Sequence, residues 1–109
     1  KYPSSRFGFI SSMTDDQNTL FFGFGQDCNM LNTMTPTPLP GNVYTDGLMD
    51  LRMNYMNTAR WSTYFVTGSN HIFLQPNLYE GTVSQGVKLT QWIDDMVNLN
   101  RPVPTNVGP

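Results

Sequence analysis

Apolar residues in this chain form short runs, two with the spacing of strands and two with the spacing of helices. Residues 6–12 (RFGFISS) and 61–67 (WSTYFVT) are rich in aromatic or branched side chains, so both are predicted to be strands. Helical periodicity predicts helices over 45–59 and 90–97. The apolar stripes consist of Leu48, Leu51, Tyr55 and Ala59 in the first helix and of Trp92, Ile93, Met96 and Val97 in the second.

Polar residues, glycines and prolines separate these runs. The sequence TDD at 14–16 can cap a further helix directly after the first strand, which Gly23 then ends. Three prolines predict an extended excursion over 35–42, after a short helix around 28–34. Thr45 or Asp46 is expected to cap the helix that follows. The segment between the second strand and the last helix is predicted to be a loop with a glycine-punctuated turn.

The resulting order is strand, helix, proline-rich excursion, helix, strand, loop, helix. Strands separated by helices favour an α/β fold with a parallel sheet. Two strands alone do not make a stable sheet, which normally needs three or a covering partner. We therefore expect residues 1–109 to be the C-terminal part of a single domain that a missing N-terminal part completes.

Composition narrows the class of partner. The net charge is −2 and the six basic residues are scattered, which argues against binding to the phosphates of nucleic acids. No apolar run approaches the roughly 18 residues that a membrane span needs. The charged share is only 13%, so neutral polar side chains fill the surface, as in secreted proteins that meet carbohydrate. Cys28 is the only cysteine and is expected to pack as a small apolar residue.

Two polar loops follow the predicted strands. SSMTDDQ comes after the first strand, and GSNH, with the only histidine of the chain (His71), comes after the second. Functional groups gather at the carboxyl ends of parallel strands, so an aspartate and His71 are expected to meet there. The histidine would act as general base and the carboxylate would fix its tautomer. A metal site is not expected, because His71 has no second His or Cys nearby.

The stretches YPSSRFGFISSMTDDQNTLFFGFG, STYFVTGSNHIFL and LYEGTVSQGVKLTQWIDDMV together resemble the C-terminal part of bacterial pectin-acetylesterase-like α/β-hydrolases. The resemblance covers nearly the whole chain except its proline-rich middle. It matches Asp16 to an aspartate before a phenylalanine pair and His71 to the end of a Gly-x-x-His loop. It also matches 86–92 to a Gly-Val-x-Leu-x-x-Trp segment that opens the last helix. The resemblance thus implies an α/β-hydrolase fold with Asp16 and His71 as two members of a Ser-His-Asp triad.

The choice between the two adjacent aspartates rests on spacing. The distance to the phenylalanine pair favours Asp16, and Asp15 would then be a solvated residue in the first turn of the helix. No Gly-x-Ser-x-Gly nucleophile motif occurs in the sequence, so the serine and the oxyanion hole would come from the missing N-terminal part. The chain alone would lack its nucleophile.

The sequence therefore supports two readings. The first is the C-terminal portion of a secreted or cell-envelope serine esterase that acts on an ester or acetylated polysaccharide and needs no metal or organic cofactor. The second is a non-catalytic extracellular module that binds carbohydrate or has a structural role, in which His71 is an ordinary turn residue. A serine-bearing partner polypeptide would distinguish the first reading from the second.

Overall fold

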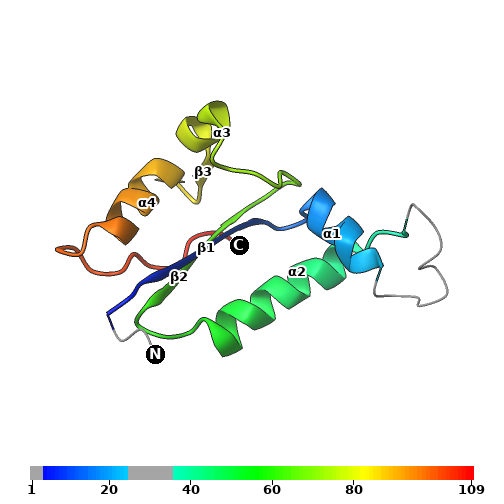
Figure 1. The fold of residues 1–109 in the computed structure, drawn as a ribbon, viewed down its shortest axis with the longest axis horizontal. Helices are drawn as coiled ribbons and strands as arrows, with labels where there is room; N and C mark the ends of the chain where they lie inside the picture. Colours follow the sequence, from blue (N-terminus) through cyan, green and yellow to red (C-terminus); the bar gives the residue numbers. More distant parts are fainter. Residues whose placement is uncertain (1–3, 25–35) are drawn as a thin grey trace.

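A computed structural model describes residues 4–24 and 36–109 of the chain (Figure 1). This part is a small mixed α/β domain with four α-helices and two small sheets. The elements are β1 (Phe7–Ser12), α1 (Asp16–Gly23), α2 (Gly41–Asp50), a π-helical segment η2 (Leu51–Tyr55), β2 (Trp61–Val66), α3 (Pro76–Gly81), β3 (Val83–Ser84), β4 (Val87–Lys88) and α4 (Leu89–Val97).

The central feature is the parallel pair of β1 and β2. It runs in register from Phe7 beside Trp61 to Ser12 beside Val66. On the other edge of β2, Val107 from the C-terminal tail forms a parallel bridge with Tyr64. Both strands therefore end at the same side of the sheet, as the sequence predicts for a parallel α/β arrangement.

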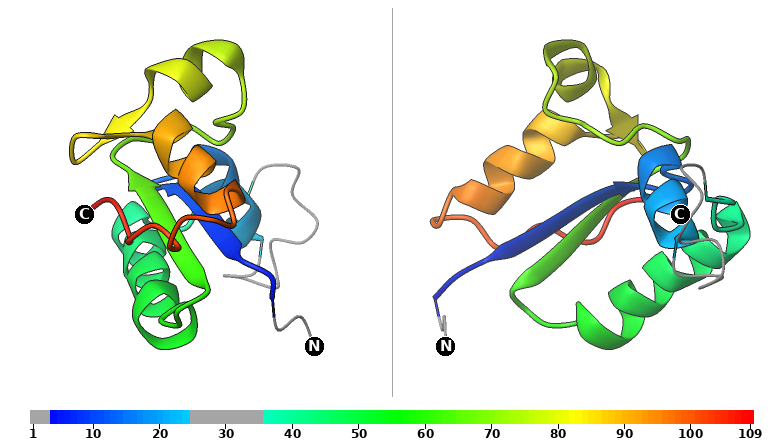
Figure 2. Two further views of the ribbon diagram at one scale, coloured as in Figure 1. Left: turned by 90° about the vertical axis from the view of Figure 1, so that its left-hand side faces the viewer. Right: turned by 45° about the vertical axis from the view of Figure 1, so that its right-hand side comes forward.

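Helices cover the two faces of this pair: α2 lies on one side and α4 on the other (Figures 1 and 2). Because side chains of a strand alternate between faces, neighbouring residues of β2 enter different cores. The α4 face buries Tyr64, Phe73, Leu89, Trp92, Met96 and Val107. The α2 face buries Met13, Tyr44, Leu48 and Phe65.

The strand predictions and the last helix are confirmed within one residue, but the second helix differs. It begins at Gly41, with Pro40 at its N-cap, and not at Thr45. The hydroxyl of Thr45 donates a hydrogen bond to the Met13 carbonyl at 2.7 Å, so this residue tethers the helix to the end of β1. Near its end the backbone widens, and the amide of Met56 donates to the carbonyl of Leu51 at 2.8 Å, five residues back.

Parts of the predicted apolar stripes are exposed. Leu51 and Tyr55 of η2 and Val97 of α4 lie on the surface, and the helix predicted over 45–59 ends at Tyr55, so Ala59 lies beyond it and is exposed too. Thus the expected core faces of these helices are only partly buried by the described residues.

The segment after β2 is more ordered than the predicted loop. Pro76 starts the short helix α3, as expected for a residue that lacks an amide donor. The turn between β3 and β4 contains Gln85 and Gly86, both with positive φ angles of 47° and 78°. Such angles are typical of a tight hairpin turn.

The proline-rich excursion is described only from Pro36 onward. Residues 36–40 are neither helix nor strand, in agreement with the prediction, and α2 starts directly after them. The predictions for Cys28 and for a helix around 28–34 lie outside the described residues. Within residues 4–24 and 36–109, no helix has the length and apolar character of a membrane span.

Candidate functional site: an Asp15–His71 pair at the strand ends

The loops that follow β1 and β2 continue the pairing of the strands. The amide of Met13 donates to Val66 O at 2.8 Å, that of Thr14 to Gly68 O at 3.1 Å and that of Asp16 to Ser69 O at 3.2 Å. Gly68 has a φ of 119°, a conformation that side chains with a Cβ rarely adopt. This backbone ladder holds the two polar loops side by side.

The side chain of Ser12 adds a further link between the loops. Its hydroxyl donates a 2.6 Å hydrogen bond to the carbonyl of Asn70, the residue directly before the histidine. Since Ser12 is itself buried at the end of β1, it anchors the backbone of the second loop to the sheet.

Asp15 is the N-cap residue of α1 and is buried. One of its carboxylate oxygens, Oδ1, accepts a 2.8 Å hydrogen bond from the backbone amide of Asn18. The other, Oδ2, accepts a 3.2 Å bond from the Asn18 side-chain amide. The Asp15 side chain is only 3% exposed, so its carboxylate is fixed within the protein.

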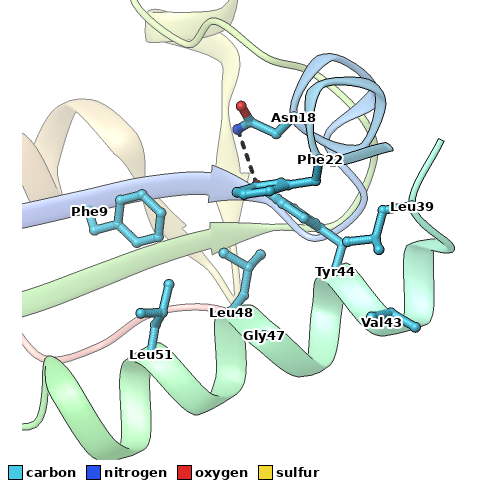
Figure 3. Close-up of a pocket in the computed structure, with 9 residues that line it drawn as sticks. All are labelled: Phe9, Asn18, Phe22, Leu39, Val43, Tyr44, Gly47, Leu48 and Leu51. Carbon is cyan, nitrogen blue, oxygen red and sulfur yellow. Dashed lines mark hydrogen bonds between the residues drawn. The ribbon is translucent and has the colours of Figure 1, made fainter. Parts of the chain in front are cut away.

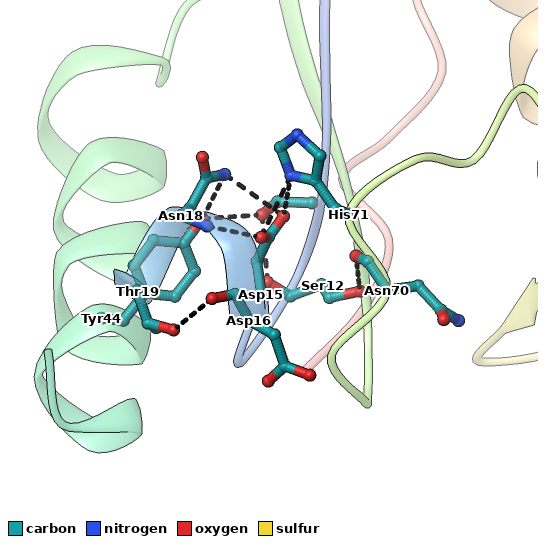
Figure 4. A network of polar contacts seen from close by, with 9 residues as sticks. Ser12, Asp15, Asp16, Asn18, Thr19, Tyr44, Asn70 and His71 are labelled. Atoms are coloured by element: carbon teal, nitrogen blue, oxygen red, sulfur yellow. Dashed lines mark hydrogen bonds and ion pairs between the residues drawn. The ribbon is translucent and has the colours of Figure 1, made fainter. Parts of the chain in front are cut away.

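The imidazole of His71 meets this carboxylate. Its Nδ1 lies 3.1 Å from Oδ1 and 3.0 Å from Oδ2 of Asp15 (Figure 4). The His71 side chain is 41% exposed, and its second ring nitrogen is directed away from Asp15. Asp15 and His71 are 56 residues apart in the sequence, and the parallel strands bring them together.

The expected meeting of an aspartate and His71 is thus observed, but the aspartate is Asp15 and not Asp16. Asp16 is the first residue of α1, is exposed, and its side chain points away from the histidine (Figure 4). The preference for Asp16 as the partner of His71 is therefore corrected. The physical reason is that the strand-to-helix turn directs the capping side chain inward and the next one to solvent.

Sequence reasoning missed the polar residues behind Asp15. Asn18 donates a 3.2 Å hydrogen bond to the hydroxyl of Tyr44 as well as contacting Asp15. The Tyr44 hydroxyl lies 3.2 Å from Ser11 Oγ. Asn18 stands three residues after the N-cap, which could have drawn attention to it. No signal in the sequence predicts that Tyr44 lies next to Asn18.

A shallow cavity of about 420 Å³ opens beside the histidine. Side chains with neutral amides contribute much of its lining, which consists of Gln17, Asn70, His71, Ile72, Gln75 and Leu78. Among these residues His71 is the only one that can carry a charge. The exposed imidazole therefore faces a space with neutral hydrogen-bonding groups around it.

A second cavity, of about 520 Å³, lies on the α2 face of the sheet, between Phe9 of β1 and the helices α1 and α2 (Figure 3). It is almost entirely apolar and is lined by Phe9, Asn18, Phe22, Leu39, Val43, Tyr44, Gly47, Leu48 and Leu51. The Asn18–Tyr44 hydrogen bond joins two of its lining residues (Figure 3), and Asn18 also donates to Asp15.

Shifted pKa values occur elsewhere in the described part of the chain. Burial raises the pKa of the Tyr64 hydroxyl, because the charged phenolate loses hydration, and the hydrogen bond from the Ser84 amide opposes this in part. Burial lowers the pKa of Arg52. A hydrogen bond from Arg101 lowers the pKa of Asp95 on α4. These groups support the fold and do not line the cavity at His71.

The Asp15–His71 pair has the chemistry of a general base with its orienting acid. A carboxylate next to Nδ1 favours the tautomer with a proton on Nδ1 and leaves the other nitrogen free to accept one. Within the described residues, the hydrogen bonds of the His71 ring involve Nδ1 only.

Comparisons of the chain with protein-family models, curated proteins and solved structures found no match. The resemblance to pectin-acetylesterase-like hydrolases therefore remains a prediction from sequence motifs.

Proposed function

We propose that this chain supplies the acid and the base of a serine-type carboxylic ester hydrolase of the α/β-hydrolase kind. The observation that carries the proposal is the buried Asp15 carboxylate at 3.0 Å from Nδ1 of a half-exposed His71, at the carboxyl ends of two parallel strands. Asp15 takes the role that the sequence motif had assigned to Asp16.

In this proposal a serine from the N-terminal part of the same enzyme lies near the free nitrogen of His71. The histidine removes the proton of the serine as its oxygen attacks the ester carbonyl, and then gives that proton to the leaving alcohol. Asp15 holds the imidazole and stabilises its protonated form. Backbone amides outside this chain bind the oxyanion.

The open apolar surface is evidence for the proposed N-terminal part, which would pack beside β1. Among the described residues, β1 pairs with a strand along one edge only, and the 520 Å³ apolar cavity lies on the α2 face of the sheet beside Phe9 of β1. Phe22 of α1 lines this cavity and is 59% exposed. Exposed apolar surface of this kind usually marks a contact with another segment or chain.

The proposed substrate is an ester with a neutral, hydroxyl-rich alcohol, such as an acetylated polysaccharide. Support comes from the side-chain amides of Gln17, Asn70 and Gln75 around His71, which can donate to and accept from sugar hydroxyls. No lysine or arginine lies among the residues that line this cavity in the described part of the chain.

Labelling of the intact native protein with a fluorophosphonate, followed by mass mapping, tests the proposal. The label is expected on a serine in the part of the protein outside these 109 residues, or in a polypeptide that co-purifies with them. Asp15→Asn should slow ester hydrolysis by up to about 10⁴-fold, because an amide favours the wrong tautomer of the histidine. Asp16→Asn is the matched control and should keep nearly full activity.

The opposite results would support the non-catalytic module. Absence of label on any polypeptide associated with this chain, together with ester hydrolysis that survives His71→Ala, would remove the esterase proposal. Binding of neutral polysaccharide that depends on Gln17 or Gln75 would then favour carbohydrate binding.

A further inference from the structure

Asn18 and Tyr44 form a polar support behind Asp15 that the roles proposed above do not include. We propose that Asn18, oriented by the Tyr44 hydroxyl, is a positioning residue for the Asp15–His71 pair. The inference rests on the proposed function, because positioning matters only if His71 is a base.

The contacts of the Asp15 carboxylate show how much Asn18 contributes. Among the described residues, the carboxylate receives hydrogen bonds from only two of them, His71 and Asn18. Asn18 provides a backbone amide at 2.8 Å to Oδ1 and a side-chain amide at 3.2 Å to Oδ2. Each oxygen thus has one donor from Asn18 on one side and the imidazole on the other, which fixes the plane of the carboxylate.

The protons in this network can be assigned one after another. The hydroxyl of Ser11 donates to the carbonyl of Ser12 at 3.0 Å, so Ser11 Oγ is free to accept from Tyr44. The Tyr44 hydroxyl has one proton, and it is then used on Ser11. The Tyr44 oxygen must therefore accept from Asn18, and the atom that donates is Nδ2.

This assignment decides which way the Asn18 amide faces. Its NH₂ group donates one proton to Tyr44 and the other to Asp15. With the amide turned over, its carbonyl oxygen would face both the Asp15 carboxylate and an oxygen whose proton is already used. Tyr44 and Asp15 therefore favour the same orientation of the Asn18 amide, and the hydroxyl of Tyr44 helps to hold the NH₂ group against the Asp15 carboxylate.

The side chain of Asn18 is not needed to start the helix. The N-cap bond of α1 uses the backbone amide of Asn18, which remains in an alanine variant. The side-chain amide is therefore available for a role in the site, and its removal can be tested without removal of the cap.

Asn18→Ala in the intact protein is the first test. With ¹⁵N-labelled histidine, the NMR signals of His71 report the share of the tautomer protonated at Nδ1. We expect this share to fall and kcat for ester hydrolysis to drop about tenfold at unchanged KM, as for the loss of one hydrogen bond to a charged group. Asn54→Ala is the matched control, because Asn54 donates to the carboxylate of Asp50 on an exposed part of the fold.

Tyr44→Phe is the second test and keeps the aromatic ring in the apolar cavity. Without the hydroxyl the Asn18 NH₂ group loses one of its two acceptors and is held less firmly against Asp15, so we expect the same tautomer change and a drop in kcat of about threefold, smaller than in Asn18→Ala. Combination of the two changes should add little to Asn18→Ala alone, since both act through one amide.

The outcomes separate this inference from the proposed function. An unchanged His71 tautomer in folded Asn18→Ala and Tyr44→Phe would overturn the positioning role, even if the protein is an esterase. A changed tautomer in a protein that hydrolyses no ester would support the effect of Asn18 on Asp15 and His71. It would at the same time contradict the proposed esterase function. A tautomer change without any change in kcat would also overturn the inference.

Discussion

The two faces of the β1–β2 pair are packed to different degrees. On the α4 face, Tyr64, Leu89 and Trp92 are almost completely buried, and the indole nitrogen of Trp92 donates to Ser62 Oγ at 3.2 Å. On the α2 face, Phe65 and Leu48 are buried, but Leu51 is 37% exposed beside an apolar cavity of about 520 Å³. One face is closed by the described chain and the other is left open.

This difference places the candidate site at a boundary. The closed α4 face provides a rigid support for β2 and hence for the loop that carries His71. The open α2 face includes Met13, directly after β1, and Tyr44, which accepts a hydrogen bond from Asn18 behind Asp15. A polypeptide that covers the open face would therefore lie beside Asn18 and Tyr44, which line its cavity, on the side of the sheet opposite to α4.

Removal of the largest buried side chain of the α4 face should have the largest effect. Trp92→Ala is expected to lower the free energy of unfolding by about 3–5 kcal/mol, because it leaves a cavity between α4 and the sheet. Val97→Ala on the same helix is the control, since Val97 is 69% exposed and should change stability by less than about 0.5 kcal/mol. Urea unfolding measures both, and equal effects would contradict the closed face.

A smaller loss is expected on the α2 face. Leu48→Ala should cost about 2–3 kcal/mol, at the lower end for a buried leucine, because its surroundings already include a cavity. Leu51→Ala should cost less than about 1 kcal/mol if the face stays open in solution. A cost for Leu51→Ala as large as that for Leu48→Ala would show that another segment covers this face in the intact protein.

The next largest effect on stability is expected in the C-terminal tail, which lies along β2. Gly108 has a φ of 99°, and a Cβ added there would lie 2.2 Å from the carbonyl oxygen of Phe65. Gly108→Ala should therefore destabilise the fold by roughly 1–3 kcal/mol. Gly47→Ala in α2 has no atom within 4 Å of the added Cβ and should stabilise the helix by about 0.5–1 kcal/mol. Opposite signs in thermal unfolding are the expected result.

The smallest effect concerns charge at the solvent side of α4. A hydrogen bond from Arg101 lowers the pKa of Asp95, so Arg101→Gln should raise that pKa toward its ordinary value of 3.8. Because the folded-state pKa is lowered, the associated stability is present above the unfolded pKa and is lost as pH falls through the folded one. NMR titration of the Asp95 carboxyl checks this. An unchanged pKa in Arg101→Gln would contradict an interaction between Arg101 and Asp95.

Much of the fold could be predicted because its signals are local. The strand at 61–66 follows from its aromatic and branched residues, and α4 follows from helical spacing. The start of α2 at Gly41 could not be predicted, because glycine and proline favour turns and Thr45 resembles a cap. The contact that overrides these preferences joins Thr45 to the Met13 carbonyl, which is distant in sequence.

The sequence was sufficient to predict that an aspartate meets His71. It was not sufficient to predict which aspartate this is or which residues support it. Polar loops after two strands were sufficient to bring His71 to the TDD segment. The choice of Asp15 depends on which residue becomes the N-cap, and a boundary of this kind is uncertain by one residue or more in any sequence. Asn18 lies in the first turn of α1 and so had a local signal, whereas Tyr44 joins the site through packing of α2 next to α1, for which the sequence has no local signal.

The backbone ladder between the two loops has a consequence for how this region tolerates changes in length. Asp16 N pairs with Ser69 O and Thr14 N with Gly68 O. These hydrogen bonds fix which residues of the two loops lie opposite each other. An insertion of one residue in either loop would carry Asp15 or His71 out of reach of its partner. Variants of this protein that keep the pair should therefore vary in side chains at these loops while the number of residues stays constant.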